Sequence, residues 1–425
     1  MSTRTTHSKT KINWINTMVF LCAFLASMVP RYISTFKLRL GINISFYTLM
    51  VALTYILFVH RFAIFRKIQS WFIPIWFLFV LLSVWKAEQF GEWAYYLVWT
   101  LTSVLFAQIL YRSDRTEVFN SLIKGLLCGL MIHLIIGLIE ISAHRYFFAV
   151  SIERRSYYGN VPVSIFHNPN DYVTFVVTML PFAISYMMKQ KSLLIKAYYA
   201  IMAILSVYLI IMSVSRSAFF AMVLLAVTLI WLAYKKSNLN KLNIIIGAIV
   251  LMGIVFAVPQ IRGRIFALFS SNRMDIAGTD NARWNLIKNG FYFLRETYGT
   301  GVGAGNMRYW LSNRAIYSTG GLLFIHNWYV ELLATFGIVF FILYMIFHAK
   351  IIVTLTRKYD PKSQFWNFDN TVLVSFVGFS IVSIASSSNI YSEWIWMYLV
   401  FVGTYSMFRE IETARSGIRI EVQRI

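Results

Sequence analysis

The sequence predicts an all-α, polytopic integral membrane protein, with a single membrane domain that extends over residues 1–425. Its composition is the first observation behind this prediction. Of its 425 residues, 58% are hydrophobic and 13% are charged, whereas a soluble domain has about 45–50% apolar and about 25% charged residues. The second observation is that the apolar residues fall in repeated runs of about 20, the length that crosses the hydrocarbon core of a bilayer as a helix.

These runs predict about twelve transmembrane helices. Residues 1–13 are basic and precede the first run, as in a signal peptide. That run is long and lacks a small-residue cleavage site, so we expect a retained first helix. The expected spans are 14–34, 41–60, 71–86, 93–111, 119–142, 171–188, 194–213, 217–234, 243–259, 326–348, 370–388 and 391–408.

The net charge of +22 is compatible with nucleic acid, but the positions of the basic residues exclude that partner. The lysines and arginines lie mostly in short loops between apolar runs, as the positive-inside rule expects. With an even number of spans both termini lie on one side, and the segments of that side carry more lysine and arginine than the opposite segments. We therefore expect both termini in the cytoplasm.

Metal and disulfide chemistry are not indicated by the sequence. Cys22 and Cys128 both lie inside apolar runs, and no HExxH, CxxC or clustered pair of aspartates is present. We expect no metal and no cofactor.

One long extracytoplasmic loop, about 259–325, separates the ninth and tenth expected helices. Within it, residues 281–295 predict an amphipathic helix that could lie along the bilayer surface. The apolar residues that recur there at helical spacing are Trp284, Ile287, Phe291 and Leu294. The glycines of residues 299–306 lack the lysine of a P-loop and the preceding strand of a dinucleotide fingerprint, so they predict a tight or flexible turn.

His326 and Asn327 open the tenth expected helix, next to this loop. An imidazole is the side chain best suited to take a proton near neutral pH; the alternative is an interfacial histidine that hydrogen-bonds to the loop. Arg216 lies between two apolar runs with almost no loop, and an arginine so close to hydrocarbon needs a partner or an aqueous cavity. It could bind a phosphate through paired hydrogen bonds, or extend to the lipid headgroups.

Further polar residues are expected on the same outer side. Asn168 and Asp171 open the sixth expected helix, where they either cap the helix or present polar groups to a substrate. Glu140 lies near the outer end of the fifth helix, as a functional residue or as the partner of a buried arginine. Arg154 and Arg155 come between these two helices, and as a charge pair alone they would be solvated or bound to headgroups.

Several arginines and one histidine at the outer leaflet suit one kind of chemistry. Guanidinium groups stabilise the negative charge that grows on a departing phosphate, and a histidine can deprotonate an acceptor hydroxyl. A pyrophosphate leaving group needs no metal if enough cationic charge surrounds it. These residues could therefore hold a lipid-linked pyrophosphate while a hydroxyl attacks the sugar that it carries.

The order and spacing of short motifs also give a family resemblance, which covers roughly residues 160–345. The motifs are Asn-Pro-Asn-Asp at 168–171, Ser-Arg-Ser at 215–217, Arg283 in the amphipathic segment, Gly-x-Gly-x-Gly at 301–305, His326 with Asn327, and Gly337. In this order the chain resembles the O-antigen ligase and O-antigen polymerase superfamily of bacterial membrane glycosyltransferases.

The resemblance implies an inverting, metal-independent glycosyltransferase in the bacterial cytoplasmic membrane. Its donor would be an undecaprenyl-pyrophosphate-linked glycan and its partners the acceptor glycan and the bilayer. His326 would activate the acceptor, and Arg216 and Arg283 would bind the pyrophosphate. The remaining candidates, which would orient sugar or phosphate, are Arg154, Arg155, Asn168, Asp171, Asn327 and Glu140.

More than one function fits these residues. A polymerase of lipid-linked repeat units is preferred here, on general likeness, over a ligase that moves finished glycan to a lipid A core or another acceptor. A transporter or flippase would need ionisable residues spread through mid-membrane positions and repeat symmetry, and neither is clear. In a membrane scaffold, the same polar residues would only cap helices.

Overall fold

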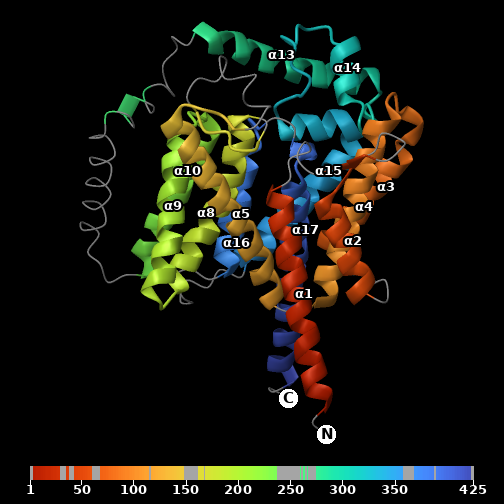
Figure 1. Cartoon of the computed structure of the whole chain (residues 1–425). Coiled ribbons are helices and arrows are strands. Elements are labelled where there is room, and N and C mark those ends of the chain that lie inside the picture. The colour runs from red at the N-terminus through yellow and green to blue at the C-terminus, as the bar shows by residue number, and fades with distance from the viewer. Residues whose placement is uncertain are drawn as a thin grey trace. The chain divides into compact units, whose positions relative to one another are not determined.

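In the computed structural model the described chain is helical apart from one short two-stranded ribbon (Figure 1). The structure describes residues 3–28, 35–37, 43–59, 68–113, 116–147, 161–166, 168–236, 259, 262–263, 266, 274–357, 368–386 and 389–422. The α-helices of these residues are α1 (Thr3–Met28), α2 (Phe46–Phe58), α3 (Ile68–Leu82), α4 (Phe90–Ser113), α5 (Thr116–Ala143), α8 (Pro169–Lys189), α9 (Leu193–Met212), α10 (Arg216–Lys236), α13 (Met274–Glu296), α14 (Met307–Asn313), α15 (Trp328–Arg357), α16 (Phe368–Val382) and α17 (Glu393–Val422). The shorter elements are β1 (Thr35–Lys37), β2 (Asn43–Ser45) and the 3₁₀ turns η1 (Val84–Lys86) and η2 (Asn389–Tyr391).

Five of the described helices are long and apolar enough to cross a membrane, which identifies an integral membrane protein. They include Phe90–Arg112, Glu117–Ala143, Pro169–Lys189, Leu193–Met212 and Trp328–Thr356. Shorter apolar helices of 10–17 residues are Trp14–Met28, Phe46–Phe58, Trp71–Leu82, Arg216–Thr228 and Phe368–Val382.

The predicted all-helical class is confirmed, and eleven of the twelve expected spans coincide with a described helix. The exception, 243–259, lies outside the described residues except for its last position. The second span differs at its start, because β2 occupies 43–45 and pairs antiparallel with β1. Ser45 then caps α2, since its Oγ accepts the amide of Thr48 at 3.1 Å. Whether every expected span crosses the bilayer remains a prediction.

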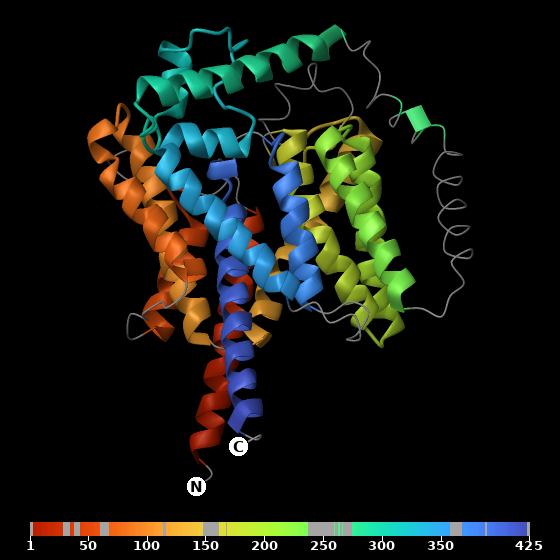
Figure 2. The same cartoon turned by 180° about the vertical axis from the view of Figure 1, so that it is seen from behind.

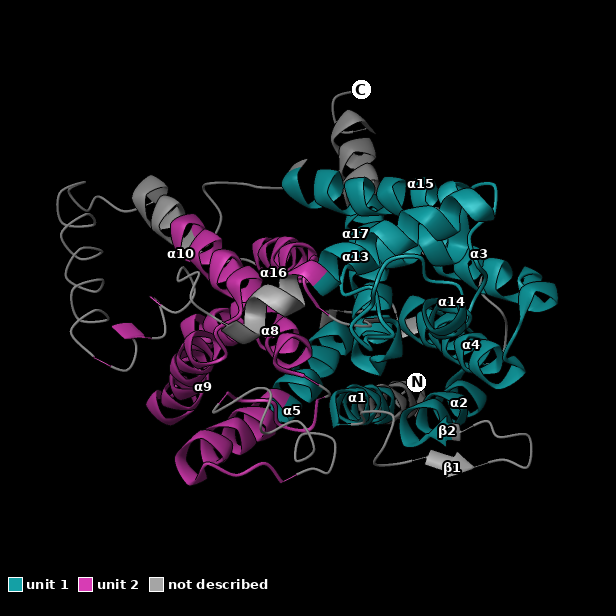
Figure 3. Ribbon diagram, turned by 90° about the horizontal axis from the view of Figure 1, so that it is seen from above, with its two compact units in different colours: residues 1–129, 282–357, 388–425 teal, residues 130–281, 358–387 magenta. Residues whose placement is uncertain are grey.

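The chain divides into two compact units, each built from separate stretches of sequence (Figure 3). Unit 1 contains residues 1–129, 282–357 and 388–425, and unit 2 contains residues 130–281 and 358–387.

Unit 1 is a bundle in which α4 packs on α2, α3 and α17, while α15 packs on α3 and α17. Its interior is aromatic, because the helices meet through large flat side chains that bury much apolar surface. Trp76 of α3 is fully buried. Its ring lies 4.4 Å from Trp396, 5.1 Å from Phe340 and 6.1 Å from Trp328, measured between centroids. This packing fixes where α15 begins.

Unit 2 is centred on α8, which packs on α9, α10 and α16. Nearly every residue of the first four turns of α8 is buried. Ser375 of α16 donates a hydrogen bond to the carbonyl of Thr178 at 2.7 Å, so the two helices are joined by a polar contact inside an apolar interface.

Candidate functional site

The helix α15 is broken at Gly337, which has φ 86° and ψ 178°. The break divides it into a first part, 328–336, and a second part, 338–357, which run in different directions (Figure 2). A side chain at this position would place its Cβ 2.5 Å from the carbonyl oxygen of Gly299, so only glycine fits. The expected span 326–348 coincides with α15, which begins at Trp328 and bends sharply at Gly337.

The residues 299–305, called here the glycine loop, supply the hydrogen bonds that the break removes from the helix. The amide of Ile338 donates to the carbonyl of Gly299 at 2.9 Å. The amides of Val302 and Gly303 donate to the carbonyls of Ala334 and Thr335 at 2.9 and 2.8 Å. Backbone groups freed by a kink need such partners when they are buried. The tight turn predicted from the glycines is confirmed, since all four have positive φ.

Side chains also join the glycine loop to the end of α3 and to η1. Asn306 is fully buried, and its Nδ2 donates to the carbonyls of Lys86 and Val302 at 2.7 and 2.8 Å. The Nζ of Lys86 donates to Thr300 Oγ1 at 2.8 Å and to the carbonyl of Gly301 at 2.9 Å. Burial lowers the pKa of Lys86, so this ammonium loses its charge at a lower pH than an exposed lysine.

His326 lies immediately before α15 and has a left-handed backbone, with φ 56°. For a residue with a Cβ this conformation costs about 1–2 kcal/mol, so the neighbouring residues must hold it. Ile325 is fully buried in the apolar cluster under α13. Asn327 caps the helix, because its Oδ1 accepts the amide of Val330 at 3.1 Å. Trp328 is buried and donates from Nε1 to the hydroxyl of Tyr344 at 2.9 Å.

Phe324, two residues before His326, lies between a cation and a tyrosine. The guanidinium of Arg308 is 5.6 Å from its ring centroid, and the ring of Tyr391 meets it edge-on at 5.6 Å. Both neighbours also bind Glu92: Arg308 Nη1 at 3.5 Å and the Tyr391 hydroxyl at 3.3 Å. The sequence interpretation did not select these three residues, although an acid in the first turn of an apolar helix and an arginine just after the glycine loop were available signals.

The helix α13 packs its buried face against the start of α15. Leu286 and Phe293 are fully buried in one cluster with Ile325 and Ala334. A Cβ at Gly290 would lie 2.8 Å from Val330, so α13 and α15 approach closely there. Arg283 is half-buried and comes seven residues before Gly290, on the same helical face and about 10 Å along the axis. Arg283 and His326 both belong to unit 1.

The predicted amphipathic helix 281–295 exists, but its first residue differs from the prediction. It begins at Met274, seven residues earlier. Of the predicted apolar face, Trp284 and Phe291 are 58% and 51% exposed, so they are free to meet lipid or solvent. The buried face of α13 contains Leu286 and Phe293. The polar residue Asn289 lies between them in the sequence and is also buried, where its Oδ1 accepts the amide of Tyr317 at 3.0 Å. The sequence pattern therefore did not identify this face as apolar.

In unit 2, Asn168 and Asp171 form the N-terminal cap of α8. Asn168 Oδ1 accepts the amide of Asp171 at 3.0 Å, and its Nδ2 donates to Asp171 Oδ2 at 2.7 Å. Pro169 occupies the first helical position, where its missing N–H costs nothing. The structure thus gives both polar residues a helix-capping role.

Glu140 and His133 of α5 hold the segment that precedes α8. Glu140 is fully buried, and its Oε2 accepts the amides of Val163 at 3.0 Å and Ser164 at 2.7 Å. His133 Nδ1 lies 3.0 Å from the hydroxyl of Ser164, which has a left-handed backbone with φ 55°. Among the residues that the structure describes, the carboxylate binds backbone amides and no arginine, the partner that the sequence left open.

Arg216 is the first residue of α10, and it is exposed. Ser215 precedes it and accepts the amide of Phe219 through its carbonyl at 3.0 Å. Arg154 and Arg155 lie outside the described residues. Of the predicted site, Arg283, His326 and Asn327 belong to unit 1, and Glu140, Asn168, Asp171 and Arg216 belong to unit 2.

The described helices define a polytopic integral membrane protein, in which His326 and Asn327 lie directly before the broken helix α15. Residues 201–345 match the O-antigen ligase family. They include Arg216, Arg283, the glycine loop, His326 and Gly337. This part of the chain is therefore similar to the O-antigen ligase family, and the resemblance predicted from the motifs is confirmed.

The chain is also similar to the teichuronic acid biosynthesis protein TuaE of Bacillus subtilis (strain 168). The two are 28% identical over 345 residues, which cover 77% of this chain and 70% of TuaE.

Proposed function

We propose that the protein is a membrane glycosyltransferase of cell-surface polysaccharide biosynthesis that polymerises lipid-linked repeat units. It would transfer a glycan from an undecaprenyl-pyrophosphate donor to a sugar hydroxyl at the outer face of the cytoplasmic membrane. The match of residues 201–345 to the O-antigen ligase family supports a role in glycan transfer, and the name of the relative TuaE supports surface polysaccharide as the product. The proposal includes about twelve spans with both termini in the cytoplasm.

The observation that carries the proposal is the geometry at His326. Its backbone is held in a left-handed conformation by a buried residue on one side and a helix cap on the other. Fixed orientation is what a general base requires, because proton transfer depends on distance and angle to the acceptor hydroxyl. Strain of this kind concentrates at functional sites.

In this mechanism the His326 imidazole takes the proton of the acceptor hydroxyl while the oxygen attacks the anomeric carbon of the donor sugar. The new C–O bond forms as the bond from that carbon to the pyrophosphate oxygen breaks, and the configuration inverts. Arg283 and Arg216 stabilise the charge on the departing pyrophosphate, so no metal is needed. The sequence also predicts orienting roles for sugar or phosphate at Arg154, Arg155, Asn168, Asp171, Asn327 and Glu140. The structure gives the last four of these residues hydrogen bonds that serve the fold, so a substrate role for them stays a prediction.

A ligase reaction is the second candidate, because the matching family is described as O-antigen ligase. It uses the same donor and the same base but a different acceptor, such as a lipid A core.

The test is to incubate the purified protein with a lipid-pyrophosphate-linked repeat unit and no other acceptor. A polymerase gives a ladder of longer lipid-linked glycans. The His326→Ala substitution should reduce the rate of ladder formation by about 10²–10⁴-fold, the usual contribution of a general base. The matched control is His144→Ala, since His144 is exposed and also has a left-handed backbone, with φ 51°.

A ladder that persists in His326→Ala would remove His326 from the mechanism. No ladder, followed by transfer once a lipid A core is added, would favour the ligase.

A further inference from the structure

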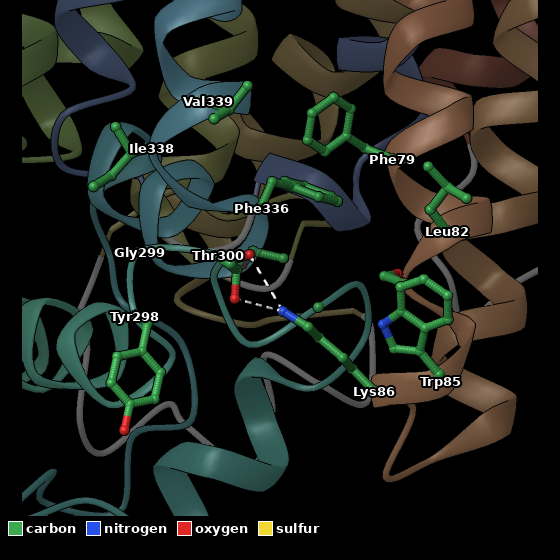
Figure 4. A pocket seen from close by; sticks show the side chains of 13 residues that line it. Phe79, Leu82, Trp85, Lys86, Tyr298, Gly299, Thr300, Phe336, Ile338 and Val339 are labelled. Atoms are coloured by element: carbon green, nitrogen blue, oxygen red, sulfur yellow. Dashed lines mark hydrogen bonds between the residues drawn. The ribbon is translucent and has the colours of Figure 1, made fainter.

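A cavity of about 490 Å³ opens in unit 1 where the glycine loop meets the break in α15 (Figure 4). The end of α3 and η1 form one wall, and the glycine loop and the residues around Gly337 form the other. Its volume falls within the range of ordinary small-molecule sites. The side chains that this argument uses are Phe79, Leu82, Trp85, Lys86, Tyr298 and Val339.

The lining of this cavity is amphiphilic. Its walls are apolar, and Lys86 is the lysine among the lining residues, placed where η1 meets the glycine loop (Figure 4). The hydrogen bonds to Thr300 and Gly301 hold its ammonium at that edge. Trp85 and Tyr298 are 78% and 95% exposed at the mouth, the side chains that proteins place at membrane interfaces. An apolar chain with an anionic head matches this arrangement.

The cavity and His326 lie at opposite ends of the first part of α15. This part spans 328–336 and is about 12 Å long. His326 precedes it, whereas the amides of Val302 and Gly303 donate to the carbonyls of Ala334 and Thr335 at its far end. Measured along the helix axis, the two ends of this part are therefore about 12 Å apart.

That separation decides which substrate fits. The donor pyrophosphate is attached to the carbon that the hydroxyl attacks, so it must lie beside the base during transfer. In a lipid-linked acceptor the phosphate is separated from the attacking hydroxyl by the whole repeat unit, a length of several sugar rings. A lipid phosphate at Lys86 suits the acceptor and not the donor.

We propose that this cavity binds the polyprenyl chain of the lipid-linked acceptor, with the acceptor phosphate near Lys86. This inference rests on the proposed polymerase function and adds a second lipid site to it. A single cavity of about 490 Å³ suits one isoprenoid chain better than the several acyl chains of a lipid A core.

The experiment separates the two substrates by chemical blocking. The donor is an undecaprenyl-pyrophosphate repeat unit whose acceptor hydroxyl is methylated. The acceptor is a repeat unit on a phosphonate linkage that cannot leave, made with either an undecaprenyl or a two-isoprene chain. Val339→Trp fills the cavity from an exposed position on α15, and Leu82→Trp fills it from α3. The control is Ile342→Trp, which is also exposed on α15 but does not line the cavity.

The wild type should show a KM for the long-chain acceptor about tenfold lower than for the short-chain acceptor. Val339→Trp and Leu82→Trp should remove that difference, leave kcat with the short acceptor unchanged and leave the dependence on donor chain length unchanged. Ile342→Trp should behave as the wild type. Loss of donor-chain dependence instead would assign the cavity to the donor, and unchanged acceptor KM values in both filled variants would overturn the proposal.

Direct labelling distinguishes failure of this inference from failure of the polymerase function. A photoreactive undecaprenyl phosphate should label the cavity of the wild type, less so in Val339→Trp. Labelling without any transfer would keep the lipid site and reject the polymerase. Equal competition by phosphatidylglycerol would identify an ordinary phospholipid site and contradict the proposal.

Discussion

Two helices, α8 in unit 2 and α15 in unit 1, begin in closely similar ways. Each has an asparagine cap whose side-chain oxygen accepts an amide three residues on: Asn168 from Asp171 at 3.0 Å and Asn327 from Val330 at 3.1 Å. A left-handed residue precedes each cap at a different distance: Ser164, with φ 55°, lies four residues before Asn168, and His326, with φ 56°, lies directly before Asn327.

The difference lies in what surrounds the left-handed residue. Near α8 the ionisable groups hold backbone, since Glu140 binds the amides of Val163 and Ser164 and His133 contacts the Ser164 hydroxyl. At α15 the backbone is anchored by other residues, and the left-handed position itself carries the imidazole. An asparagine cap therefore does not by itself indicate a catalytic site. A titratable residue on a strained backbone is a stronger indication of one.

The largest effect is expected at the break that gives α15 its short first part. Gly337→Ala would force a Cβ to within 2.5 Å of Gly299 and a left-handed backbone on alanine. We expect a loss of about 3 kcal/mol or more in the free energy of unfolding, with loss of activity. Thermal unfolding in detergent measures it. Gly91→Ala is the control, because nothing lies within 4 Å of a Cβ there. Equal stability of both variants would contradict the close contact between the glycine loop and Gly337.

A smaller effect on stability is expected at Glu140, whose carboxylate accepts two buried backbone amides. Glu140→Ala leaves two buried amides without an acceptor and should lower the free energy of unfolding by about 2–3 kcal/mol. Glu140→Gln keeps one acceptor oxygen and should lose less. Both are compared with the wild type by unfolding and by turnover per folded molecule. A normal stability with abolished turnover would move Glu140 from the scaffold into the reaction.

The smallest effects are expected at the two caps. Asn168→Ala and Asn327→Ala should each cost about 1 kcal/mol, and serine at either position should restore most of it. Unfolding midpoints of the four variants test this. If Asn168→Ala stopped glycan transfer at unchanged stability, the helix start of α8 would bind substrate directly.

Much of the helical framework could be predicted from the sequence, because the length of an apolar run alone marks a membrane helix. The motif residues His326, Arg283 and Gly337 were also visible, since their order along the chain is specific. The cap at Asn168 followed from local residue chemistry, as helix caps depend only on neighbouring positions.

Non-local contacts could not be predicted in this way. The partner of the break at Gly337 is Gly299, in a loop 38 residues earlier, and no local pattern connects the two. The buried face of α13 was missed because Leu286 and Phe293 pack against residues after the glycine loop. The same holds for Arg308 and Glu92, which come together only when α14 meets the start of α4.

The central claim is that His326 is the base of a glycosyl transfer, and chemical rescue tests it most directly. Glycine accepts a left-handed backbone, so His326→Gly should fold as the wild type does while losing about 10²–10⁴-fold in rate. Added imidazole should restore part of the rate, and more so as the pH rises and imidazole becomes the neutral base. A His326→Gly protein that keeps the wild-type rate, or that imidazole stimulates no more than it stimulates His144→Gly, would contradict the claim.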